Sequence, residues 1–169
     1  MNDLSPTHRR RARLADAVLA ALVLGPPAAP LLAAWGLLVP RLVSDTIYTM
    51  GAFVCPQPAY GPVLYDGWIM AVCMRCYGTV LGLLITRLLY AIDGGAGRYW
   101  LIHMGLRALP VFAALIFVYP AEYAGQVAGL WGFDHGITTF AGLITGGGLG
   151  LLFHPVLQGN HSPRIADSR

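Results

Sequence analysis

The sequence predicts an all-α, polytopic membrane protein with about four transmembrane helices and a cysteine-bearing loop at the outer face of the bilayer. Composition gives the class, because 56% of the 169 residues are hydrophobic and only 11% are charged. In an average soluble domain about a quarter of the residues are charged. A third observation places the loop: all three cysteines lie between positions 55 and 76, directly before an apolar run.

The first apolar run, residues 14–40, contains Asp16 as its only ionisable side chain. It is long enough for a spanning helix, which needs about 20 residues. Pro26, Pro27 and Pro30 interrupt the run, and none of them has the N–H that a helix interior uses. We therefore expect a kink or break there, with neighbouring helices satisfying the freed carbonyl groups.

The outer loop follows this span. Ser44 precedes a short amphipathic stretch, and its hydroxyl is expected to cap the start of a helical turn that leads to Cys55. Residues 56–66 are rich in Pro, Gly and Tyr, which indicates an ordered loop lying on the membrane surface.

Two of the predicted spans carry glycines at every fourth position. The second span begins near Trp68 or Cys73, ends near Asp93, and contains Gly78 and Gly82. The fourth span covers residues 136–154, and its glycines are Gly142, Gly146 and Gly150. Small residues at this spacing let two helices approach closely in lipid, so the two stripes are expected to contact each other or a partner.

Arg75 and Arg87 bracket the second span, and we expect their long side chains to extend to opposite interfaces. The third span is predicted from Leu106, or from as early as Leu101, to about Tyr119. We interpret residues 120–135 as a short interfacial helix and turn.

The arginines also predict orientation, because cytoplasmic flanks carry an excess of basic residues. The chain has no lysine, which excludes lysine Schiff-base chemistry and lysine-centred phosphate loops. With four spans, residues 1–13 form a basic cytoplasmic tail, 14–154 the transmembrane domain and 155–169 a second cytoplasmic tail. The basic tail is interpreted as the flank of a membrane helix, so no nucleic-acid partner is expected. The cysteines then face outward from a cell inner membrane, on its oxidising side.

Several of these residues resemble a known family. They are Pro26 to Leu32, Ile47-Tyr48, Cys55-x-Gln57, Gly67 and the run from Val72 through Cys73-Met74-Arg75-Cys76 to Gly82, followed by Pro120, Gly125 and Thr145-Gly146. This pattern resembles the bacterial membrane proteins of domain-of-unknown-function family 2085, over roughly residues 20–152. Pro56 stands where the family's Cys-His-Gln motif has its histidine, which weakens any metal or catalytic role that the resemblance implies.

The cysteines permit redox chemistry. Cys73 and Cys76 are three residues apart at the start of a predicted helix, and a helix N-terminus together with Arg75 stabilises a thiolate. The alternative is a buried structural disulfide, or small apolar thiols in a packed interface. Three thiols cannot all pair within one chain. If the site is structural, Cys55 is expected to pair with Cys73 or Cys76.

Metal binding ranks below redox chemistry. Cys73, Cys76 and Cys55 supply three ligands, so a fourth would have to come from His135 or Asp134. Two functions therefore remain open. The chain is an accessory or assembly subunit that docks on other membrane proteins, or it is a membrane thiol-disulfide oxidoreductase or metal-binding protein. The sequence favours the first narrowly, and it leaves open the cofactor, the substrate and whether the protein is an enzyme.

Overall fold

The computed structural model describes residues 6–92 and 107–157, which form five α-helices and one two-stranded antiparallel hairpin. Residues 55–73 contain three short elements, the 3-10 turn η1 (Pro58–Tyr60) and the strands β1 (Val63–Tyr65) and β2 (Trp68–Ile69). The helices are α1 (Pro6–Ala34), α2 (Leu38–Val54), α3 (Met74–Ile92), α4 (Leu109–Val127) and α5 (His135–Leu157).

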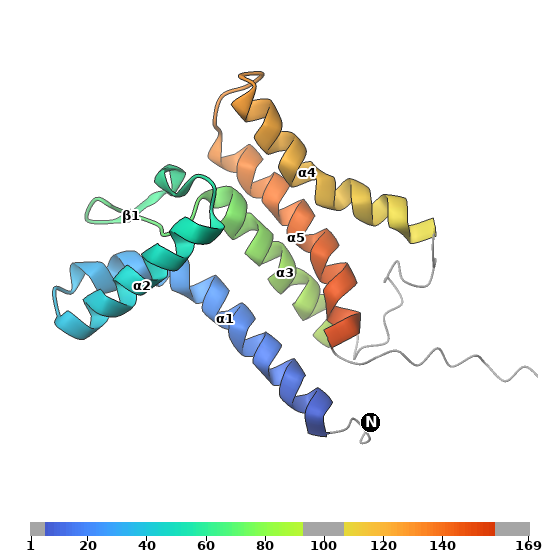
Figure 1. Ribbon diagram of the computed structural model, residues 1–169, viewed down its shortest axis with the longest axis horizontal. Helices are drawn as coiled ribbons and strands as arrows, with labels where there is room; N and C mark the ends of the chain where they lie inside the picture. Colours follow the sequence, from blue (N-terminus) through green and yellow to red (C-terminus); the bar gives the residue numbers. More distant parts are fainter. Residues whose placement is uncertain (1–5, 93–106, 158–169) are drawn as a thin grey trace, which may run out of the picture.

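The long helices run along one another, and their ends divide the molecule into two poles (Figure 1). The start of α1 and the ends of α3 and α5 lie at one pole, and the hairpin and the start of α3 lie at the other. We call the second pole the cysteine end. Helix α2 folds back beside the last part of α1, and this pair extends sideways from the bundle.

Three helices in the described part of the chain are long and apolar enough to cross a membrane: Arg10–Ala34, Met74–Ile92 and His135–His154. Helix α4 is 19 residues long but is not among them. Its second half carries Glu122 and Gln126. The predicted class of all-α membrane protein is thus confirmed, and the count of four spans is approximate. The predicted start of the third span, 101–106, lies outside the described residues.

Helix α1 continues through its three prolines and changes direction in its last part, as expected (Figure 1). Because Pro27 has no N–H, the carbonyl of Val23, four residues earlier, loses its helical donor. The hydroxyl of Tyr77 on α3 donates to this carbonyl at 3.3 Å. A neighbouring helix thus satisfies a group that proline frees, which confirms that part of the prediction.

Helix α2 begins at Leu38, six residues before the predicted cap, so the prediction for Ser44 was wrong. The Ser44 side chain is fully buried, and its hydroxyl donates to the carbonyl of Ala29 on α1 at 2.8 Å. Sequence reasoning assigned the hydroxyl to a local backbone partner. The fold instead uses it to join two helices, and a buried hydroxyl needs such a partner.

The two glycine stripes pack against each other along α3 and α5, as the spacing predicts. A Cβ atom at Gly78 would overlap the Thr139 carbonyl, and one at Gly146 would overlap the Thr79 carbonyl. The two backbones are therefore in direct contact, which only a residue without a side chain allows. This interface fixes the position of α3 and hence of the cysteines at its start.

Helix α4 does not end at Tyr119 but continues through Pro120 to Val127, so the predicted interfacial helix and turn was wrong. The Thr145 hydroxyl of α5 lies between two α4 groups that would otherwise bond to each other. It donates to the Leu115 carbonyl at 3.1 Å and accepts from the Tyr119 N–H at 3.1 Å. A side chain inserted into the helical ladder bends a helix without ending it, and α4 therefore carries Tyr119 over the start of α3.

Candidate thiol site

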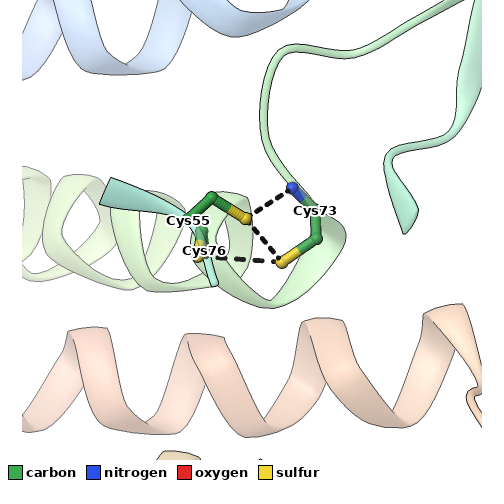
Figure 2. A group of neighbouring side chains, drawn as sticks. All are labelled: Cys55, Cys73 and Cys76. Carbon is green, nitrogen blue, oxygen red and sulfur yellow. Dashed lines mark hydrogen bonds between the residues drawn. The ribbon is translucent and has the colours of Figure 1, made fainter. Parts of the chain in front are cut away.

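The three cysteines meet at the cysteine end, with all three sulfur atoms within 4.8 Å of one another. Figure 2 shows their side chains pointing toward a common centre. The Cys73 sulfur lies 3.2 Å from that of Cys55 and 3.7 Å from that of Cys76. A disulfide bond is about 2.05 Å long. The structure therefore describes three free thiols, and the pairing of Cys55 with Cys73 or Cys76 that the sequence suggested is not formed here.

Cys55 reaches the site because the chain returns closely past the end of α2. Cys55 is the C-terminal cap of that helix, and its N–H donates to the Gly51 carbonyl at 2.8 Å. A Cβ atom at Gly51 would overlap the Ala71 carbonyl, so glycine permits this approach. The return itself is made by the β1–β2 hairpin, whose turn residues Asp66 and Gly67 have φ of 44° and 80°. Positive φ at two central residues is typical of a tight hairpin turn.

Cys73 directly precedes α3, and Cys76 lies in the first turn of that helix. The carbonyl of Cys73 accepts the N–H of Tyr77 at 3.0 Å, which makes Cys73 the N-terminal cap residue of α3. The N–H of Cys73 in turn donates to the Cys55 sulfur at 3.3 Å. Unpaired N–H groups at a helix start favour negative charge nearby, so this position suits thiolates.

Burial and mutual hydrogen bonding set the electrostatics of the thiols. Cys73 is fully buried, Cys55 is 3% exposed and Cys76 is more accessible. The hydrogen bonds with the thiols of Cys73 and then Cys76 lower the pKa of Cys55. The bond to Cys55 raises the pKa of Cys73. Of these two thiols, Cys55 therefore ionises more readily than Cys73.

Arg75 does not extend to the interface, so that prediction was wrong. Its side chain is fully buried, and its guanidinium donates to the Glu122 carboxylate at 2.5 Å. It also donates to the amide oxygens of Gln57 at 3.1 Å and Gln126 at 2.5 Å. A charged group away from water needs a charge partner and further hydrogen bonds, and two α4 side chains together with Gln57 of the loop supply them here. Because Glu122 neutralises it, Arg75 stabilises a thiolate less than the sequence suggested.

Tyr119 connects the thiols with α4. Its hydroxyl lies 3.5 Å from the Cys76 sulfur, and the Arg75 guanidinium lies 5.6 Å from the centre of its ring. The ring also lines a cavity of about 300 Å³ that two of the cysteines, Cys55 and Cys76, reach. The site thus combines three thiols, one phenol and an adjacent cavity.

The structure does not bring His135 or Asp134 to the thiols. The cluster within 4.8 Å, among the described residues, contains the cysteines only. His135 is exposed at the start of α5, with its ring edge-on to Phe133 at 4.9 Å. The Asp134 carboxylate accepts the N–H of Ile137 at 2.8 Å, which is the contact of a helix cap. The fourth metal ligand proposed from the sequence is therefore not in place.

Sequence reasoning missed the polar residues that surround the site. Tyr119, Glu122 and Gln126 come from a stretch that was interpreted as the end of a span and a loop. One signal was available, since a buried arginine within an apolar helix requires an acidic partner. Glu122 is the acid nearest to the third apolar run, and pairing it with Arg75 would have indicated that α4 continues past Pro120.

A family model described as "Predicted membrane protein (DUF2085)" matches residues 55–152, more than half of the chain. The match begins at Cys55 and ends within α5, so it includes all three thiols, Arg75 and Glu122. No curated protein and no solved structure matches the chain.

Proposed function

The chain belongs to the DUF2085 family of predicted membrane proteins, and we propose that its three cysteines form a thiol redox centre. The observation that carries the proposal is the central position of Cys73, whose sulfur lies 3.2 Å from Cys55 and 3.7 Å from Cys76. Cys73 is within about 2 Å of bonding distance to either neighbour, given an S–S bond of about 2.05 Å. The protein is then a membrane thiol-disulfide oxidoreductase.

In the oxidised form of this centre, two of the three cysteines are joined in a disulfide and the third is a free thiol. Oxidation breaks two S–H bonds and forms one S–S bond, while two electrons and two protons pass to an oxidant of the disulfide or quinone class. When the disulfide joins Cys73 and Cys76, the Cys55 thiolate can attack the Cys73 sulfur. This exchange forms a disulfide between Cys55 and Cys73 and releases Cys76 as a thiolate. The Tyr119 hydroxyl, 3.5 Å from Cys76, is placed to donate a hydrogen bond to the sulfur that leaves.

Burial limits which molecules can react. Cys73 has no exposed surface and Cys55 only 3%, so a folded protein disulfide cannot approach either sulfur. Cys76 is the more accessible thiol and lines the cavity. The centre is therefore suited to a small reactant that enters beside Cys76, with Cys73 completing the bond.

The test is a count of thiols before and after oxidation of the purified full-length protein. The sample is treated with the thiol oxidant diamide, freed of reagent and alkylated with a mass tag. The wild-type protein and the Cys55→Ser and Cys76→Ser variants should each lose two thiols. Cys73→Ser should lose none, because it lacks the sulfur that both others approach most closely.

A wild-type protein that keeps all three thiols contradicts the proposal. So does a Cys73→Ser variant that forms an internal disulfide as readily as the wild type. Unfolding of the variants by heat is measured in parallel, and equal unfolding temperatures show that a lost reaction is not a lost fold.

A soft metal ion is a second candidate, favoured by the convergence of the three sulfurs within 4.8 Å. A zinc ion with bonds of about 2.3 Å to tetrahedral thiolates places the sulfurs about 3.8 Å apart, close to the distances here. Thiolates select Zn²⁺ or Cu⁺. Elemental analysis of the purified protein detects a bound metal, and alkylation with and without a chelator separates the two candidates. Thiols that hold a metal should be unreactive until the chelator removes it, whereas the thiols of a redox centre react without the chelator.

A role as accessory or assembly subunit has less support. The hypothesis relied on glycine faces and aromatic outer loops that dock on larger membrane partners, and the structure occupies the first of these. Along α3 and α5 these glycines contact each other's backbones, for example Gly142 against the Arg75 carbonyl. Purification in mild detergent tests the role, since a stoichiometric partner subunit that survives the purification would support it and a homogeneous single chain would contradict it.

We also infer that the cysteine end faces outward and both termini face the cytoplasm of a cell inner membrane. The arginine distribution supports this orientation. In a variant with all three cysteines replaced by serine, an impermeant thiol reagent should label Tyr65→Cys in the hairpin, where Tyr65 is 52% exposed. It should miss Gly95→Cys after α3. The opposite labelling reverses the orientation.

A further inference from the structure

The cavity beside the thiols has walls from four segments of the chain. Its volume is about 300 Å³, within the range of about 300–1,000 Å³ that is usual for small-molecule sites. The apolar residues of its wall are Leu22 and Pro26 of α1, Val54 of α2, and Val72 and Val80 on either side of the start of α3. Such a wall favours a ligand that is itself apolar and dissolves in the bilayer.

The polar groups of the cavity are few and include the reactive ones. Cys55, Cys76 and Tyr119 all line it, whereas Cys73 does not. The hydroxyl of Thr79, a further lining residue, donates to the Arg75 carbonyl at 3.1 Å and is thus engaged within α3. A ligand in the cavity would therefore meet the Cys76 sulfur and the Tyr119 hydroxyl together.

Helix α1 contributes the part of the cavity wall that lies at its prolines. Pro26 has no N–H, so the carbonyl of Leu22, four residues earlier, loses its helical donor. Both residues line the cavity. The cavity thus combines an apolar wall with a hydrogen-bonding hydroxyl, that of Tyr119, next to the Cys76 sulfur, which matches an apolar molecule that carries acceptor oxygens.

We propose that this cavity binds a membrane-borne quinone, which oxidises the thiols and leaves as the hydroquinone. The inference rests on the proposed redox function and names its co-substrate class. In the reaction the S–H bonds of Cys76 and Cys73 break and a bond forms between their sulfurs. The two electrons and two protons reduce the two carbonyl groups of the quinone to hydroxyl groups. The Tyr119 hydroxyl donates a hydrogen bond to the quinone oxygen nearest Cys76.

The experiment follows a single turnover under anaerobic conditions. Reduced full-length protein in lipid nanodiscs is mixed with a decyl-substituted benzoquinone, and hydroquinone and remaining thiols are measured together. We expect one hydroquinone formed and two thiols lost for each protein molecule. A hydroquinone yield that does not match the thiol loss contradicts the mechanism.

A matched pair of α3 variants tests whether the reaction occurs in the cavity. Val80→Phe enlarges a lining residue, while Ile85→Phe enlarges a residue that does not line it and is 44% exposed. Val80→Phe should slow quinone reduction at least about tenfold, because displacing the ring from the thiols by an ångström is enough for such a loss. Ile85→Phe should react like the wild type, and equal rates for the two variants overturn the cavity assignment.

Diamide oxidation of the same samples separates this inference from the redox function itself. Disulfide formation with diamide but no reaction with the quinone refutes the quinone site and leaves the redox centre standing. No disulfide with either oxidant refutes both. Ile85→Phe should form the disulfide with diamide as readily as the wild type, since Ile85 does not line the cavity. An unfolding temperature of Val80→Phe equal to that of the wild type shows that its slower quinone reaction is not a lost fold.

Discussion

Helix α3 carries two arginines, and each pairs with an acid from another helix in a different setting. Arg75 at the cysteine end is fully buried, and the side chain of its partner Glu122 is 8% exposed. Arg87 near the opposite end is 21% exposed, and its partner Asp16 is 44% exposed. Similar sequence features, an arginine at each boundary of one apolar run, thus give a buried ion pair in one place and a partly exposed one in the other.

The difference in burial between the two ion pairs indicates that the stability of the cysteine end depends more on its ion pair than the stability of the opposite pole does. Arg87 and Asp16 contact each other through two bonds of 2.6 and 2.8 Å, and both side chains are partly exposed at the protein surface. Arg75 has no exposed surface and depends on protein groups alone. We therefore expect α4 to be held at the cysteine end chiefly by Arg75, whereas α1 needs Arg87 much less.

The largest effect is expected from Glu122→Ala. It leaves a buried guanidinium without its counter-charge, which destabilises a protein by about 3–5 kcal/mol. Glu122→Gln, which keeps an acceptor oxygen, should cost less. Equilibrium unfolding in mixed detergent micelles measures both values. Glu122→Ala should also raise the rate at which Cys76 is alkylated, because α4 covers that thiol through Tyr119.

The middle of α3, between the two arginines, sharpens the comparison because backbone packing dominates there. A Cβ atom at Gly146 overlaps the Thr79 backbone, whereas one at Gly147 meets nothing within 4 Å. Gly146→Ala should destabilise the protein by about 1–3 kcal/mol through overpacking. Gly147→Ala should be neutral or stabilise it by up to about 1 kcal/mol, since alanine favours a helix. If thermal unfolding shows the same loss for both variants, the stripes do not pack as described.

The smallest effect is expected at the opposite pole. Asp16→Asn removes one charge of a partly exposed pair, and such pairs contribute about 0–1 kcal/mol. The loss should shrink further at high salt, which screens exposed charges. The same unfolding assay at low and high ionic strength checks this. If Asp16→Asn lowers the free energy of unfolding as much as Glu122→Ala does, the proposed difference between the two poles is wrong.

The features that the sequence predicted correctly follow from local pattern. Gly78 and Gly146 lie in four-residue stripes, and close helix contact follows from the absence of a side chain whatever the partner is. The grouping of Cys73 with Cys76 follows from helical spacing. The proximity of Cys55 was expected from a loop long enough to return, although the hairpin turn at Asp66 and Gly67 that produces the return was not foreseen.

The features that it did not predict depend on groups far apart in the chain. Pro120 indicates a helix end, but the Thr145 hydroxyl of α5 bonds within the α4 ladder one residue earlier, and the helix continues. Ser44 has the residue type of a cap, yet its hydroxyl bonds to α1. Arg75 was expected to extend to the membrane interface, because local sequence does not reveal that its partner is Glu122, which lies 47 positions away. Tertiary partners decide each of these cases, and local propensity does not contain them.

The central claim, that three thiols from two segments form one centre, is tested most directly with arsenite. Arsenic(III) replaces three hydroxyl groups by three sulfurs only if all three lie close together, and as a soft centre it prefers thiolates. Reduced protein should gain one arsenic by intact mass and lose all three alkylatable thiols, with full recovery after a small dithiol is added. A protein that binds no arsenic, or keeps Cys55 free to alkylate when arsenic is bound, contradicts the account.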